Sequence, residues 1–353
     1  MRVMYDDEAQ SADKERGLLF HYTDAVGLLG IIDHPRFPSG YERIERLDFT
    51  RVVQFKASDV RYMNDRDELH FAGRIFAEQF RAAAHNRTVQ AAGRPAVTVS
   101  EGTATDLLEL AAEFERDKFY GEPVQVFAVS VSREGDLLSQ WRGYAGGTGG
   151  YAIGFSRAVL EDHTWTTPPL GVDSADPSGG IGVFLGHIPG PTELQDVVYS
   201  EESIRDIAND AIARQAASPS RPDTQHQGGS LFDLRWATVP QLARFKNPGF
   251  AEEQEARILA VVSGMPYRGL PAAHAEFRPG RRAGLVPYWS LAVNLELGLG
   301  TRTWGDRPET TIERLVVGPG PEQHLRASAA RQLLVTNGHD PDVVVLSRLP
   351  FTG

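Results

Sequence analysis

The sequence predicts an α+β protein in which mixed or antiparallel central sheets are flanked by helices. Two kinds of periodicity support this class. Apolar stretches rich in β-branched residues, such as residues 123–132 and 284–293, are typical of strands, whereas residues 64–84 repeat apolar side chains at helical spacing. Strands and helices also follow one another without the regular alternation of a doubly wound parallel sheet.

The individual elements follow from the same patterns and from capping residues. Strands are expected at residues 17–23, 51–59, 123–132, 151–156, 256–264, 284–293, 311–319 and 342–347. Helices are expected at residues 25–33, 64–84, 106–119, 202–216, 233–245 and 322–338. Asp24 and Ser156 are suited to cap the helices that follow them, and Gly338 is suited to end the last helix.

The composition indicates one large domain over residues 1–353, with loop insertions near residues 166–191 and 217–230. Both insertions are rich in proline, glycine and serine, which favour loops. The apolar fraction of 41% can supply a sizeable core.

Charge and cysteine content restrict the function classes. The formal net charge of −11 argues against broad binding to nucleic acid or to an anionic membrane surface, but it leaves room for a local basic patch. There is no cysteine, which excludes disulfides and thiolate metal sites. No stretch approaches the ~18 apolar residues of a membrane span, and the first residues lack a signal-peptide pattern. We therefore expect a cytoplasmic protein with no membrane partner.

Several familiar motifs are absent or misplaced. Residues 147–152 match a loose dinucleotide-binding pattern, but they precede a strand instead of following one, so we reject a Rossmann interpretation. No glycine-rich run ends in Lys-Ser or Lys-Thr, as a phosphate-binding loop would. No spacing of histidines and acids predicts a metal site.

One stretch combines side chains that a packed core would not need. Gln140, Trp141, Arg142 and Tyr144 are followed by glycine-rich residues 146–150. Burying a guanidinium and an amide without partners is costly, so we expect these side chains at the rim of a ligand site. The alternative is an amphipathic helix with Trp141 in the core, joined to the next strand by a flexible turn.

Polar side chains also lie at the boundaries of two other elements. His21, Tyr22 and Thr23 end the first strand where it meets a short helix, a common position for ligand contacts. The alternative is a core tyrosine, a capping threonine and a histidine bonded to a backbone carbonyl. Asn64 lies at the start of the next helix, where it either caps the helix or contacts a ligand.

Two short repeats place like groups on one face of a strand. Ser130 and Ser132 alternate along a strand, so both hydroxyls are expected on one face, toward a cleft or in internal hydrogen bonds. Glu253 and Glu255 flank Gln254 at the start of a strand and are also expected to share a face. Carboxylates that close raise each other's pKa, which is costly unless a function uses it. The alternative is a solvated acidic loop.

Several segments together resemble the bacterial domain-of-unknown-function family 2971. The segments are LLFHYTDAVGLLGII, RYMNDRDEL, FAVSVSREGDLLSQWRGYAGGTGGYAIGF, FKNPGFAEEQEARI, GLVPYWSL and IERLVVGPG. They are spread over most of the chain, from residue 18 to residue 320, in the expected order. The resemblance implies a setting in phage defence, without naming an activity.

Three short motifs are similar, more distantly, to ADP-ribosyltransferases. That superfamily carries a basic residue on a first strand, Ser-x-Ser or Tyr on a middle strand, and often Glu-x-Glu at the start of a later strand. His21, residues 130–132 and residues 253–255 occur here in that order. The resemblance implies a split central sheet, NAD as the substrate, and His21, Ser130 and Glu255 as the catalytic residues.

The same resemblance implies roles for the remaining candidates. Glu255 would hold the ribose 2′-hydroxyl and stabilise positive charge on the ribose. Arg142 would pair with the pyrophosphate, while aromatic rings would stack on the ligand. The expected binding residues are Tyr22, Thr23, Asn64, Ser132, Gln140, Trp141, Arg142, Tyr144, Tyr151 and Glu253.

Three functions remain in competition. The first is a toxin-like, NAD-dependent ADP-ribosyltransferase that modifies a protein or nucleic acid. The second is an effector in phage defence that processes or binds nucleic acid, for which Arg278, Arg281 and Arg282 are the local support. The third is a non-catalytic module that senses nucleotides and does not need Glu255.

Overall fold

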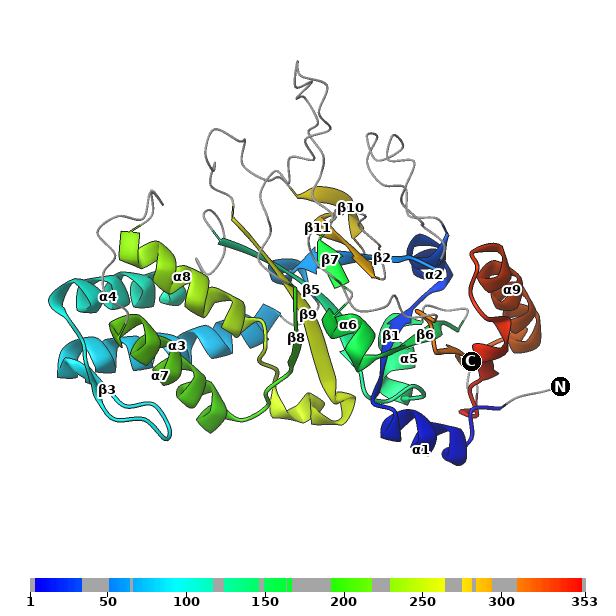
Figure 1. The fold of residues 1–353 in the computed structure, drawn as a ribbon, viewed down its shortest axis with the longest axis horizontal. Helices are drawn as coiled ribbons and strands as arrows, with labels where there is room; N and C mark the ends of the chain where they lie inside the picture. The colour runs from blue at the N-terminus through cyan, green and yellow to red at the C-terminus, as the bar shows by residue number, and fades with distance from the viewer. Residues whose placement is uncertain are drawn as a thin grey trace, which may run out of the picture.

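The computed structural model confirms an α+β fold and describes most of the chain. The described residues are 4–33, 51–63, 66–116, 124–145, 149–162, 164–166, 192–217, 229–263, 275–280, 284–293 and 310–350. A large mixed sheet crosses the centre of the molecule, and helices gather on either side of it (Figure 1). Most of both predicted loop insertions lies outside the described residues.

The helices have the following bounds: α1 (Asp7–Glu15), α2 (Ala25–Ile32), α3 (Arg66–Asn86), α4 (Glu101–Glu115), α5 (Leu138–Tyr144), α6 (Arg157–Asp162), α7 (Glu201–Ala217), α8 (Gly229–Leu242) and α9 (Gln323–Thr336). Short 3₁₀ turns cover Val60–Tyr62, Pro248–Glu253 and Pro341–Val343. The predicted caps are present, since Asp24 accepts a hydrogen bond from the Gly27 amide and Ser156 accepts one from the Val159 amide.

The strands have the following bounds: β1 (Leu18–Thr23), β2 (Val53–Asp59), β3 (Thr88–Val89), β4 (Val97–Thr98), β5 (Val124–Ser132), β6 (Tyr151–Ser156), β7 (Thr164–Thr166), β8 (Glu193–Asp196), β9 (Glu255–Ser263), β10 (Glu276–Gly280), β11 (Gly284–Val293), β12 (Arg314–Val317) and β13 (Val344–Leu346). Strands β6 and β11 have the predicted bounds. Helix α1 and strand β10 were not predicted, because neither has a clear apolar period.

Among the described residues, eleven strands form the central sheet, in the order β10-β11-β2-β5-β1-β6-β12-β13 along its main path. Strands β7, β8 and β9 join it at the side, and β9 pairs with β5 along its whole length. Strands β12 and β13 are parallel, whereas the pairings of β5 are all antiparallel. Strands β3 and β4 form a separate two-stranded sheet.

Strands β1 and β2 diverge from each other along β5. Because β9 occupies one edge of β5, β1 and β2 share the other edge. Strand β2 pairs there through Ser58 with Ala128, and β1 pairs through Phe20 with Ser132. The stretch of β5 between these contacts, which includes Ser130, faces the space where the two strands separate.

Two apolar layers hold this arrangement. Helices α3, α4, α7 and α8 pack against one another and against Val126, Ala128 and Leu259 on one face of the sheet. On the other face, apolar side chains of α2, α6 and α9 pack against β1, β2, β5, β6 and β9. Both layers fix β5 and β9, so the polar ends of these strands have a rigid support.

Candidate functional site

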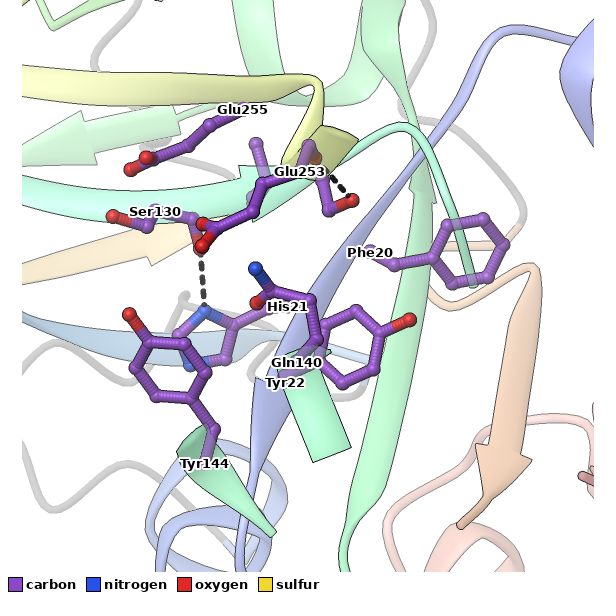
Figure 2. A pocket seen from close by; sticks show the side chains of 10 residues that line it. Phe20, His21, Tyr22, Ser130, Gln140, Tyr144, Glu253 and Glu255 are labelled. Atoms are coloured by element: carbon purple, nitrogen blue, oxygen red, sulfur yellow. Dashed lines mark hydrogen bonds between the residues drawn. The ribbon is translucent and has the colours of Figure 1, made fainter. Parts of the chain in front are cut away.

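A small pocket lies where β1 and β2 separate, next to the end of β5. Its volume is about 50 Å³, which suits one small chemical group and not a whole dinucleotide. The structure brings together side chains from four distant segments, and Figure 2 shows them around the pocket. Its polar lining includes His21, Ser130, Ser132, Gln140, Glu253 and Glu255.

His21 extends from β1 across the separation between the strands. Its Nδ1 lies 2.9 Å from the Ser130 carbonyl oxygen on β5, and its ring packs edge-on against Phe55. A carbonyl can only accept, so Nδ1 carries the proton and Nε2 of the neutral ring is an acceptor. Burial lowers the pKa of His21, and the positive charge of Arg278 lowers it further. The hydrogen bond to Ser130 raises the pKa, but its effect is smaller than that of burial. The imidazole is therefore neutral near pH 7.

Glu255 lies at the start of β9 in a buried ionic network. Its carboxylate accepts hydrogen bonds from Arg257 Nε at 2.7 Å, from Arg257 Nη2 at 3.2 Å and from Lys246 Nζ at 2.9 Å. The Ser130 hydroxyl is a fourth donor. A carboxylate offers about four acceptor positions, so these donors fill them.

The sequence analysis predicted that a neighbouring carboxylate raises the pKa of Glu255, and this prediction is wrong. Burial alone would raise the pKa of Glu255, but Arg257, Lys246 and Ser130 lower it to about 2. Two cations accompany the two glutamates, and they outweigh the repulsion between the carboxylates. Both cations, Lys246 and Arg257, lie in the same segment of the sequence as the glutamates, FKNPGFAEEQEARI. The sequence does not show that their side chains are buried and contact Glu255.

Glu253 differs from Glu255 in its partners. It ends the 3₁₀ turn before β9, and Gln254 separates the two glutamates in a left-handed conformation, with φ of 42°. The two carboxylates therefore do not share a strand face through alternation. Both nevertheless contact Lys246 Nζ, and Glu253 does so through Oε2 at 2.8 Å. In Figure 2 the Glu253 carboxylate points into the pocket above His21. No described residue bonds its second oxygen, Oε1.

The two serines on β5 both line the pocket, but they have different tasks. The Ser132 hydroxyl donates to the Glu253 carbonyl at 2.7 Å and accepts from the Glu134 amide at 3.1 Å. Ser132 therefore holds the turn that carries Glu253. Ser130 is only partly buried and bonds the Glu255 carboxylate through its hydroxyl.

Helix α5 presents one face to the pocket, through Gln140 and Tyr144, which are one turn apart. The Gln140 side chain is only 6% exposed, and its amide bonds no residue that the structure describes. Tyr22 supports the start of this helix, since its hydroxyl donates to the Glu134 carbonyl at 2.7 Å and accepts from the Leu137 amide at 3.0 Å. A buried amide directed into a pocket indicates a polar ligand there.

Three side chains expected to contact a ligand do not line the pocket. Trp141 is buried in the core, where its Nε1 donates to Asp136 at 2.7 Å and its ring contacts Tyr22 edge-on. Arg142 is exposed on another face of α5. Tyr151 is buried in the apolar layer of the sheet. The helical rotation per residue explains the first two corrections, because it directs residues 140 and 144 alone toward the pocket.

Two further candidates have other places. The Thr23 hydroxyl packs over the first turn of α2, so close to Gly27 that a Cβ there would collide with it, and Thr23 does not line the pocket. Asn64 lies outside the described residues, as do Arg281 and Arg282. Arg278 lies on β10, within the described residues.

Comparison with known proteins adds one relationship. Residues 140–258 match the model of the family described as protein of unknown function (DUF2971). The resemblance to this family is confirmed. The matched segment, about a third of the chain, runs from α5 to the beginning of β9 and so includes Gln140, Glu253 and Glu255, but not His21 or Ser130. No curated protein and no solved structure matches the chain. The similarity to ADP-ribosyltransferases therefore stays a prediction.

Two kinds of feature are absent from the described residues. None of the described helices is long and apolar enough to cross a membrane. Within the same ranges, histidine and acidic side chains form no group of three that could hold a metal ion.

Proposed function

We propose that this protein is an NAD-dependent ADP-ribosyltransferase-like effector that modifies a macromolecule. One observation carries the proposal: a neutral imidazole and an ion-paired carboxylate, from His21 and Glu253, line one pocket where two strands of the sheet separate. The pocket has room for one polar group from the nicotinamide–ribose end of NAD, and the rest of the molecule must lie outside it. A role in phage defence is part of the proposal and rests on the family resemblance alone.

The chemistry requires a group that stabilises positive charge on the ribose. The bond between ribose C1′ and the nicotinamide nitrogen breaks, and its electron pair neutralises the nicotinamide ring. An oxygen or nitrogen of the acceptor then bonds C1′ and releases its proton. His21 Nε2 can accept a hydrogen bond from a ribose hydroxyl, and the Gln140 amide can bond the nicotinamide carboxamide.

The hydrogen-bond partners of Glu253 and Glu255 assign different roles to the two side chains. The sequence assigned the contact with the ribose to Glu255, but four donors already fill its acceptor positions. Glu253 uses only Oε2, toward Lys246, and directs its carboxylate into the pocket. We therefore assign substrate contact to Glu253, and to Glu255 the positioning of Lys246 and Ser130.

Nicotinamide release from NAD by the purified protein tests this function. Glu253→Gln should lower the rate about 10²–10³-fold while thermal unfolding stays near that of the parent, because one charge facing the transition state is lost. Glu252→Gln removes a charge from the adjacent, exposed residue and should release nicotinamide at the parental rate. Glu255→Gln should lower both activity and stability.

The outcomes separate the alternatives. A parent protein that binds NAD but releases no nicotinamide would contradict the transferase and support the nucleotide-sensing module. A folded Glu255→Gln variant that loses activity while Glu253→Gln retains it would return the ribose contact to Glu255. Loss of activity in Glu252→Gln as well would show that the effect is not specific to the pocket.

A further inference from the structure

Arg278 is a half-buried cation on the same face of the sheet as the pocket residues Ser130 and Glu255. The strand registers establish this: Arg278 pairs with Val286 on β11, Tyr288 two residues on pairs with Ser58 on β2, and Ser58 pairs with Ala128 on β5. Residues two apart on a strand share a face, so Ser58, Ala128 and Ser130 connect Arg278 with the pocket.

The guanidinium of Arg278 has one neutral partner. Its Nη2 donates to the Ser58 hydroxyl at 2.7 Å, whereas its Nε is buried without an acceptor. Within the described part of the chain, no carboxylate forms an ion pair with it. Burial lowers the pKa of Arg278, and the neighbouring Tyr288, rather than a carboxylate, acts against that effect.

The nearest acid on its own strand is engaged elsewhere. Glu276 accepts hydrogen bonds from the Ser290 hydroxyl at 3.2 Å and from the Tyr288 hydroxyl. The strand thus carries an acid that could pair with Arg278 but bonds two hydroxyls instead. A half-buried guanidinium without a paired carboxylate is suited to bind an anion that is not part of the described chain.

The electrostatic influence of Arg278 reaches the pocket, since it contributes to the lowered pKa of His21. The pocket is too small for a dinucleotide, so most of such a ligand must lie outside it. We propose that Arg278 binds the diphosphate of the dinucleotide whose ribose end occupies the pocket. This inference rests on the proposed function and assigns to Arg278 the contact that the sequence analysis expected from Arg142.

Binding of two ligands by isothermal titration calorimetry tests the inference. ADP-ribose contains the diphosphate, whereas nicotinamide riboside has the ribose and the ring without phosphate. Arg278→Met should weaken ADP-ribose binding about tenfold to hundredfold, the usual effect of losing a charged hydrogen bond, and leave nicotinamide riboside binding unchanged. Arg278→Lys should recover part of the loss, because it restores the charge but not the fork of donors.

Arg142→Met is the matched control, since it removes the same charge from exposed α5 and should leave ADP-ribose binding at the parental value. Equal loss for both ligands in Arg278→Met, parental ADP-ribose binding, or no ADP-ribose binding by the parent would each overturn the inference. Failure of the proposed function looks different: Arg278-dependent ADP-ribose binding without nicotinamide release would contradict the transferase and leave the Arg278 site intact. Thermal unfolding of each variant confirms that the fold is retained.

Discussion

Two groups of charged side chains on one face of the sheet differ in how their charges are compensated. Lys246, Glu253, Glu255 and Arg257 neutralise one another at the start of β9, with the side chains of Lys246, Glu255 and Arg257 no more than 5% exposed. Arg278, at the other side of the same face, has a serine hydroxyl and no carboxylate among the described residues. Removing one member of a compensated buried group leaves the others without a partner and destabilises the fold, whereas a half-buried cation without a counter-charge costs stability that a bound anion can restore.

The largest expected effect comes from removing the cation that both glutamates share. Lys246→Met leaves two carboxylates near one another without their common partner, and should lower the free energy of unfolding by about 3–5 kcal/mol, measured by urea denaturation. Lys14→Met is the control, because Lys14 contacts Glu134 at a similar 2.8 Å but its side chain is 53% exposed. The control should cost less than about 1 kcal/mol. Equal costs would show that burial does not distinguish the two ion pairs.

Acid should weaken the same network. The pKa of Glu255 is lowered from 4.5 to about 2, although burial opposes that change. A depressed carboxyl pKa stabilises the fold above the unfolded value and loses that contribution as the pH falls from about 5 toward 2, by about 3 kcal/mol in all. Urea midpoints measured across this range should fall, and Glu255→Gln should flatten that part of the profile. An unchanged slope in the variant would assign the acid sensitivity to other carboxylates.

Asp136 extends the comparison to a partly buried acid compensated by hydrogen bonds alone. It accepts from Trp141 Nε1 at 2.7 Å, from Ser347 Oγ at 2.6 Å and from the Arg348 amide at 3.2 Å. Asp136→Ala leaves the buried indole N–H without this partner and should cost about 1–3 kcal/mol in chemical denaturation. Asp342→Ala, at an exposed turn, should cost less. A neutral Asp136→Ala would mean that water replaces the carboxylate.

The smallest effect on stability is expected at Arg278. Arg278→Met keeps much of the packing of the side-chain stem. It removes an uncompensated charge but also the hydrogen bond to Ser58, and because these effects oppose each other, the free energy of unfolding should change by less than about 0.5 kcal/mol. Differential scanning calorimetry without ligand measures this directly. A large loss would show that Arg278 has a structural partner, and the contrast with Lys246 would then fail.

Sequence patterns predicted local structure better than the direction of single side chains. Apolar stretches predicted the bounds of β6 and β11, and both predicted helix caps are present. The place of Trp141 depends on Gly318, which lies directly against its ring although it is far away in the chain, and no local pattern reports that contact. The convergence of His21, Ser130 and Glu255 was expected from the resemblance, and all three line one pocket, whereas their function stays a prediction.

Because β1 and β2 pair with the same edge of β5, the site lies between two groups of strands. His21 belongs to the strand group that continues into β6, β12 and β13, while Arg278 belongs to the group formed by β2, β11 and β10. A ligand that extends from His21 to Arg278 therefore acts as a clamp between the two halves of the sheet. Hydrogen exchange of amides on both sides of the separation should slow together when such a ligand binds, while amides in α4, which packs mainly against α3 and α8, keep their original rates.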